Sequence, residues 1–175
     1  MRVVIGTLSL SNPGGTESYC LTVARELDRL GHEVTLFNRG ITNTSRFPGL
    51  RKIRGDHMHD ASALTGEPFD VVIDVAGMGP GDVAPVVNAV VASAGRYVFV
   101  STVSVYADHS VPQVEGQPTI STREGQDGGE AYGASKAAAE HVVMEAFGER
   151  ALVVRPGLIV GPHDPRTASP TGRGG

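Results

Sequence analysis

Short apolar runs alternate along this chain with longer stretches in which apolar residues recur at helical spacing. Each apolar run has the length and the Val- and Ile-rich composition of a strand that is buried on both faces of a parallel sheet. Strands of this kind are predicted at residues 2–7, 34–37 and 70–76, and two more begin at residues 97 and 151. Residues 51–54, which are mostly basic, predict a short third strand. The stretches between them predict helices at residues 16–30, 80–94 and 134–147.

This alternation of strands and helices predicts the fold class. Parallel strands need right-handed helical crossovers, so we expect an α/β fold of three layers with a doubly wound parallel sheet, Rossmann-like, in the strand order 3-2-1-4-5-6. We expect one domain at residues 1–164, of which residues 1–37 are atypical. Residues 165–175 contain Ser, Thr, Pro, Arg and Gly and no core former, so they are expected to be a disordered tail.

Charge and composition narrow the classes of partner. The net charge is −4 with a pI near 5.8 and there is no basic stripe, which argues against a nucleic-acid partner. Cys20 is the single cysteine, no run approaches the roughly 18 apolar residues of a membrane span, and no signal peptide is apparent. We therefore expect a cytoplasmic protein with no membrane partner. His57 and His59 are two ligands at most, so no metal site is expected.

The most informative chemical motif is Tyr132-Gly-Ala-Ser-Lys136, which opens the last predicted helix. Residues four apart share one helix face, which would place the phenol of Tyr132 beside the ammonium of Lys136. A nearby cation lowers the pKa of a phenol, and such a tyrosine can exchange a proton with a hydroxyl or carbonyl substrate. The alternative is a chance match, because this spacing occurs on many helices.

The flanking strands support the functional interpretation. The strand that begins at Tyr97 ends in the hydroxyls of Ser101, Thr102 and Ser104, and the strand that begins at Ala151 ends in Arg155-Pro-Gly. Ligands of open α/β sheets bind beyond the carboxyl ends of such strands. Asp74, within the fourth predicted strand, is interpreted as a buried carboxylate with hydrogen-bond partners rather than a catalytic group.

Taken in this order, the hydroxyl-rich strand end, the Tyr-x-x-x-Lys helix and the Arg-Pro-Gly strand end resemble the extended short-chain dehydrogenase/reductases, in their NAD-dependent epimerase/dehydratase branch. The resemblance covers about residues 38–164. It implies hydride transfer to or from a nicotinamide, with a nucleotide sugar or another hydroxyl or carbonyl compound as the small-molecule substrate. It also implies catalytic roles for Thr102, Tyr132 and Lys136. A homodimer is left open.

The resemblance further implies a set of cofactor-binding residues. They are Gly6, Gly14, Gly15, Asn38, Arg39, Asp56, Ala76, Gly77, Ser101, Tyr132, Lys136, Pro156 and Gly157. The end of the second strand faces the adenosine ribose in Rossmann folds, where an acid selects NAD and an arginine accommodates the 2′-phosphate of NADP. Arg39 and the absence of an acid at residues 37–40 favour NADP over NAD.

Residues 1–37 depart from that family. Its compact Gly-x-x-Gly-x-x-Gly turn is replaced by a longer loop that ends in Gly14 and Gly15, which predicts weakened dinucleotide binding. The loop Gly14-Gly-Thr-Glu17 and the segment Gly31-His-Glu-Val34 resemble the start of a GT-B glycosyltransferase of the family 4 type. Extended family members continue into a smaller C-terminal substrate domain, which we do not expect in residues 165–175. A glycosyltransferase N-terminal domain and a non-catalytic NAD(P)-binding fragment are therefore the alternative functions.

Overall fold

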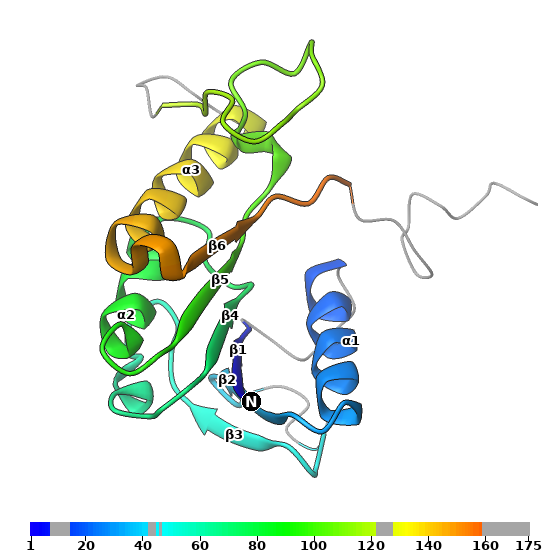
Figure 1. The fold of residues 1–175 in the computed structure, drawn as a ribbon, viewed down its shortest axis with the longest axis vertical. Coiled ribbons are helices and arrows are strands. Elements are labelled where there is room, and N and C mark those ends of the chain that lie inside the picture. Colours follow the sequence, from blue (N-terminus) through cyan, green and yellow to red (C-terminus); the bar gives the residue numbers. More distant parts are fainter. Residues whose placement is uncertain (8–14, 42–44, 46, 122–127, 159–175) are drawn as a thin grey trace, which may run out of the picture.

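The computed structural model describes residues 1–7, 15–41, 45, 47–121 and 128–158 (Figure 1). The predicted tail at residues 165–175 lies outside the described residues, and so does Gly14. Six parallel strands form one sheet in the order β3-β2-β1-β4-β5-β6. Their bounds are β1 Arg2–Gly6, β2 Glu33–Asn38, β3 Arg51–Arg54, β4 Val71–Asp74, β5 Arg96–Val100 and β6 Ala151–Val154. The predicted fold class and strand order are confirmed.

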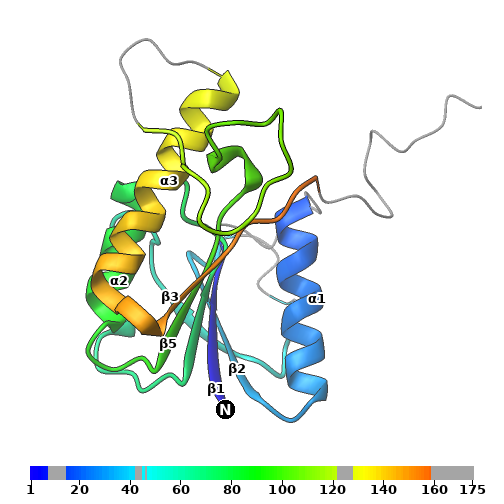
Figure 2. The same cartoon turned by 45° about the horizontal axis from the view of Figure 1, so that its top comes forward.

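Three helices cover the two faces of the sheet and make the outer layers. Helix α1, Gly15–Arg29, lies on one face, whereas α2, Pro80–Val90, and α3, Gly128–Phe147, lie together on the other (Figure 2). Single turns of 3₁₀ helix occupy η1 Ser62–Leu64, η2 Val103–Val105 and η3 Gly148–Arg150. The arrangement is the three-layer one that the strand–helix alternation predicted.

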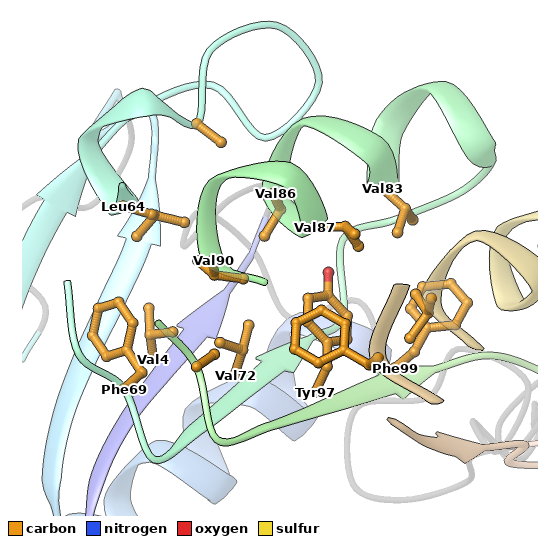
Figure 3. Packing of buried hydrophobic residues seen from close by; sticks show 14 of the residues in the cluster. Val4, Leu64, Phe69, Val72, Val83, Val86, Val87, Val90, Tyr97 and Phe99 are labelled. Carbon is orange, nitrogen blue, oxygen red and sulfur yellow. The ribbon is translucent and has the colours of Figure 1, made fainter. Parts of the chain in front are cut away.

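Successive side chains of a strand point to opposite faces of the sheet, so the buried residues form two clusters, one on each face. In β1, Val3 and Ile5 pack in one cluster with Cys20 and Ala24 of α1. Val4 belongs to the opposite cluster, which contains the inward side chains of α2 and α3 (Figure 3). Since side chains of a strand point alternately to opposite faces, a continuous apolar run is what a strand covered on both sides requires.

The helix boundaries differ from the predicted ones. Helix α2 ends at Val90 rather than at residue 94, because the chain turns there and the Gly95 N–H donates to the Phe69 carbonyl, which leads it into β5. Helix α3 begins at Gly128 rather than at residue 134. Helix α1 begins at Gly15, one residue earlier than predicted. None of these differences changes which face a helix covers.

A glycine lets α3 lie directly against the end of β5. A Cβ atom added to Gly133 would collide with the Ser104 carbonyl oxygen and would lie 3.0 Å from the carbon of that carbonyl and 3.3 Å from Ile120 Cδ1. Ser104 belongs to η2, which follows β5, so the absence of a side chain at Gly133 sets how closely the Tyr132–Lys136 segment approaches the hydroxyl-rich strand end.

We therefore expect Gly133→Ala to destabilise the protein by about 1–3 kcal/mol, because backbone must move to accept the methyl group. Chemical denaturation monitored by circular dichroism measures this. Gly129→Ala in the same helix is the matched control: nothing lies within 4 Å of its Cβ position, and alanine favours the helix. A Gly133→Ala variant as stable as the Gly129→Ala variant would contradict the close approach.

Candidate functional site

The residues predicted to bind a cofactor lie where the strands end. Gly6 and Asn38 are the last residues of β1 and β2, and Asp56 follows β3 by two residues. The others follow the remaining strands: Ala76 and Gly77 after β4, Ser101 after β5, Pro156 and Gly157 after β6. Because all six strands are parallel, these residues share the carboxyl edge of the sheet, where α/β folds bind their ligands. Gly15 is the first residue of α1.

Lys136 joins α3 to this edge. Its side chain is buried, and Nζ donates hydrogen bonds to the Gly77 carbonyl at 2.7 Å and to the Val100 carbonyl at 2.7 Å. The ammonium also lies 4.1 Å from the centre of the Phe99 ring. Burial lowers the pKa of Lys136 to about 8, although nearby carboxylates, Asp74 above all, oppose that change. Near neutral pH the ammonium is therefore still largely protonated, with one of its three N–H groups left for another acceptor.

Neither Tyr132 nor Thr102 makes a hydrogen bond to Lys136. Tyr132 is 38% exposed and, among the described residues, has no hydrogen bond or ion pair. Thr102 precedes η2, and its Oγ1 accepts from the Ser104 N–H at 3.2 Å and lies 3.2 Å from Ser104 Oγ. The exposed phenol is thus open to a ligand, while the ammonium is turned inward. That Thr102, Tyr132 and Lys136 act together remains a prediction.

A buried carboxylate connects several segments at the same edge by hydrogen bonds. Asp74, at the end of β4, is fully buried and accepts four hydrogen bonds. Oδ1 accepts from His57 Nε2 at 2.9 Å, the Ala76 N–H at 2.9 Å and the Gly77 N–H at 3.1 Å, and Oδ2 accepts from the Tyr97 hydroxyl at 2.6 Å. The interpretation of Asp74 as a carboxylate with satisfied hydrogen bonds is confirmed.

The four donors keep this carboxylate ionised. Burial alone would raise the pKa of Asp74, but the hydrogen bonds and charge of His57 and the hydrogen bond from Tyr97 lower it below the ordinary value. Burial would likewise lower the pKa of His57, and Asp74 outweighs this and raises it. Burial, and then the charge of Asp74, raise the pKa of Tyr97 well above its usual value, so its hydroxyl remains a donor.

Sequence analysis did not pair His57 with Asp74. The two residues are 17 positions apart, with His57 in the loop after β3 and Asp74 at the end of β4, so no local spacing reveals the contact. One feature of the sequence did indicate such a contact: Asp74 is the single acid within an apolar strand, and a buried carboxylate needs hydrogen-bond donors from other segments. His57, Tyr97 and the glycine turn after β4 supply them.

The end of β2 forms a turn that carries the predicted Arg39. Asn38 is buried, and its Oδ1 accepts from the Gly40 N–H at 2.9 Å. Arg39 is exposed, and Arg54 of the neighbouring β3 lies against the same turn, since a Cβ added to Gly40 would be 2.9 Å from Arg54 Nε. In the described part of the chain, neither guanidinium has a hydrogen bond or an ion pair. Both are free to meet an anion.

Asp56, predicted to reach the adenine amine, is placed beside this turn. Its Oδ1 accepts from the Met58 N–H at 3.0 Å and lies 3.4 Å from His59 Nδ1. The Met58 hydrogen bond lowers the pKa of Asp56, with smaller effects from His59 and Arg39. Its carboxylate is partly exposed and ionised, so it can accept a further hydrogen bond from a ligand.

Three buried polar atoms at the edge have no partner among the described residues. They are Asn38 Nδ2, His57 Nδ1 and Ser101 Oγ. Buried polar groups are nearly always hydrogen-bonded, so unpartnered ones at a sheet edge are consistent with a polar ligand that completes them. With the inward ammonium of Lys136 and the two free guanidinium groups, the donors fit the hydroxyls and phosphates of a dinucleotide.

The end of β6 is fixed to α3 by an ion pair. Arg155 Nε donates to Glu140 Oε1 at 3.0 Å and Nη2 donates to Oε2 at 2.7 Å, and the guanidinium lies 4.8 Å from the centre of the Tyr106 ring. The next residue, Pro156, accepts the Val103 N–H through its carbonyl at 3.1 Å, and Gly157 beyond it is exposed. This bidentate pair therefore sets where the Pro156–Gly157 backbone leaves the sheet.

No group of three or more His, Cys, Asp or Glu side chains in the described part of the chain is arranged to hold a metal ion. None of the described helices is long and apolar enough to cross a membrane.

Comparison with known proteins places the chain among NAD-binding proteins. The family model NAD_binding_4, described as male sterility protein, matches residues 61–174. Among curated proteins, chloroplast stem-loop binding protein of 41 kDa b from Arabidopsis thaliana is 32% identical over 109 residues. That match covers 53% of this chain and 29% of the Arabidopsis protein.

Solved structures share the fold at low sequence identity. A UDP-galactose 4-epimerase superposes with a TM-score of 0.64 at 24% identity, covering 89% of this chain and 55% of that one. A nucleoside-diphosphate-sugar epimerase from Pseudomonas aeruginosa gives 0.69 at 20% identity, covering 91% and 53%. A UDP-glucuronic acid 4-epimerase from Bacillus cereus in complex with NAD gives 0.65 at 18% identity, covering 94% and 58%. The chain thus spans about half the length of these structures.

The buried His57–Asp74 pair predicts a specific pH dependence of stability. A raised His57 pKa stabilises the fold fully below the unfolded value of about 6.5, and this contribution is lost as pH rises through the folded value. The contribution of the lowered Asp74 pKa is fully present above its unfolded value of about 3.9 and is lost as pH falls through the lower folded value. The stability difference between wild type and His57→Gln should therefore be largest between these limits and shrink as pH rises above 6.5.

Urea denaturation across this pH range measures the difference. His59→Gln is the control, because His59 is exposed and lies only two residues away. A His57→Gln curve that runs parallel to that of the wild type at every pH would show that the pair does not change its protonation on folding.

Proposed function

The chain belongs to the NAD-binding family described as male sterility protein, among the NAD-dependent epimerase/dehydratases of the short-chain dehydrogenase/reductase type, and on that premise we propose that it is an NAD(P)-dependent epimerase/dehydratase or reductase. The observation that carries the proposal is the placement of Lys136. It is the one lysine of α3, it follows Tyr132 by four residues, and its ammonium is drawn to the ends of β4 and β5. An ammonium held at this position would contact a ligand bound across the ends of β4 and β5.

In the proposed reaction each side chain has a separate task. The cofactor supplies hydride transfer when it is bound. The exposed Tyr132 phenol would give a proton to the substrate oxygen or take one from it, and Lys136 would donate its remaining N–H to the nicotinamide ribose. Thr102 hydrogen-bonds the same substrate oxygen through Oγ1.

The proposed cofactor site follows the strand ends across the sheet. Gly6, Gly14 and Gly15 lead to the N-terminus of α1, whose free N–H groups suit the pyrophosphate. Asn38, Arg39 and Asp56 would hold the adenosine. Ala76, Gly77, Ser101, Pro156 and Gly157 would line the nicotinamide end.

For the substrate we propose a chemical class rather than one compound. We propose a nucleotide sugar or another hydroxyl or carbonyl compound, handled by a cytoplasmic protein that acts alone or as a homodimer. The names of the epimerases that share the fold motivate this choice. The rival proposal is NAD(P) binding without catalysis, which the long loop before α1 favours because it replaces the compact glycine turn.

Titration with NADH and NADPH, monitored by nicotinamide fluorescence, tests binding, and turnover of UDP-sugars tests catalysis separately. We expect saturable binding by the wild type, and a loss of at least about 10-fold, or 1.4 kcal/mol, in Lys136→Met. Tyr132→Phe should bind almost as tightly as the wild type, because the phenol acts in proton transfer. If a panel of UDP-sugars yields turnover, Tyr132→Phe should lower kcat by about 100-fold or more.

Each outcome separates the rival functions. Binding without turnover of any sugar supports the non-catalytic alternative, and no binding of either dinucleotide overturns the proposal. A labelled RNA stem-loop is the contrasting probe, because the Arabidopsis relative is named for stem-loop binding. With a net charge of −4 we expect no saturable RNA binding at physiological salt.

The turn after β2 yields a prediction about cofactor preference. Two guanidinium groups, Arg39 and Arg54, lie at this turn without partners in the described part of the chain, and no acid is present at residues 37–40. We propose that NADPH binds more tightly than NADH. Arg39→Ala should abolish that preference by weakening NADPH about 10-fold, or 1.4 kcal/mol, while NADH is unchanged.

Arg51→Ala is the matched control for charge. Arg51 begins the same strand as Arg54 but is paired with Glu67, with two hydrogen bonds of 2.8 Å, at the opposite end of the sheet. If Arg39→Ala and Arg51→Ala weaken NADPH equally, Arg39 does not contact the 2′-phosphate.

A further inference from the structure

The backbone of Gly77 binds a buried charged group through its N–H and another through its carbonyl. Its N–H donates to Asp74 Oδ1 at 3.1 Å, and its carbonyl accepts from Lys136 Nζ at 2.7 Å. Gly77 is closely packed, because a Cβ added at this position would collide with Val83 of α2 and would lie 3.0 Å from Phe99 Cε2. The position of the Lys136 ammonium is thus coupled through one residue to the carboxylate of Asp74.

The charged groups around Lys136 belong to β4, α2 and α3. Asp74 ends β4, Asp82 lies in the first turn of α2, and Glu140 lies one turn further along α3. Glu140 is neutralised by its ion pair with Arg155, and Asp82 accepts the Met78 and Gly79 N–H groups at 3.1 Å each. His57 and Tyr97 face Asp74 itself. Asp74 is the fully buried acid of this set, where water screens its field least.

We infer that Asp74, which the proposed chemistry does not use directly, is a positioning residue for Lys136: it fixes the Gly77 peptide that binds the ammonium and supplies the negative charge that keeps the ammonium protonated inside the protein. Burying an ammonium is unfavourable unless an opposite charge and hydrogen-bond acceptors accompany it. The carbonyls of Gly77 and Val100 are the acceptors, and Asp74 is the charge.

Asp74→Asn tests the charge with little change of shape. The asparagine Oδ1 can still accept from His57, Ala76 and Gly77, and its Nδ2 can donate to the Tyr97 oxygen. The chain has two lysines, Lys52 and Lys136, so a protein grown with lysine isotope-labelled at Cε gives two resonances whose pH titrations can be followed by NMR. Lys52 on the exposed β3 is an internal control in the same spectrum.

The direction of the change distinguishes positioning by charge from a merely structural role. If Asp74 supplies the stabilising charge, Asp74→Asn lowers the Lys136 pKa from about 8 by roughly a further 1 to 3. If Asp74 only holds the fold together, the variant loosens, water reaches the ammonium, and the pKa rises toward the ordinary 10.5. A rise, or no change, overturns the inference. Asp82→Asn is the matched acid control and should lower the pKa less than Asp74→Asn does.

A second measurement applies if Asp74→Asn does not fold. The double variant Asp74→Asn, Lys136→Met then lacks the buried ammonium and should regain the folded circular dichroism spectrum, and a double variant that remains unfolded overturns the inference. The inference rests on the role proposed for Lys136, but the lysine titration needs neither cofactor nor substrate. A failure of dinucleotide binding would therefore overturn the proposed function and leave the Asp74–Lys136 coupling to be judged by NMR.

Discussion

The buried carboxylate of Asp74 is the constraint on which the carboxyl edge of this sheet depends. A carboxylate without exposure to water is stable only with several donors, and here they come from the loop after β3, from β5 and from the turn after β4. One acid thereby joins segments that are distant in the sequence. Removing any of its donors would leave charge in the core with fewer partners, so the edge is fixed as a unit.

Opposite charges extend this arrangement from the sheet to α3. Lys136 binds the carbonyls at the ends of β4 and β5, and one helical turn later Glu140 binds Arg155 at the end of β6. The helix that carries Tyr132 is therefore tied to three strand ends by two buried or half-buried charges. Packing alone would position such a helix less specifically, because apolar contacts have no preferred direction.

The sequence predicted the order of the strands better than it predicted the site. Alternation of Val-rich runs with helical stretches is a local signal, and it is sufficient for the parallel order because crossovers are right-handed. Helix ends were less accurate: α2 stops at Val90, where the chain turns into β5, and no single residue marks that turn. The pairing of His57 with Asp74 and the inward direction of Lys136 depend on contacts between distant segments, which spacing along the chain does not encode.

The candidate site is built on the carboxyl edge of the sheet. All six strand ends, with Lys136 and the free guanidinium groups of Arg39 and Arg54, belong to the described part of the chain, and they are the groups proposed to bind a dinucleotide. The chain spans about half the length of the epimerase structures that share its fold. A pocket that selects one hydroxyl compound among many needs several polar partners placed around the substrate. The side chains at the carboxyl edge are therefore the groups on which the proposed cofactor binding depends.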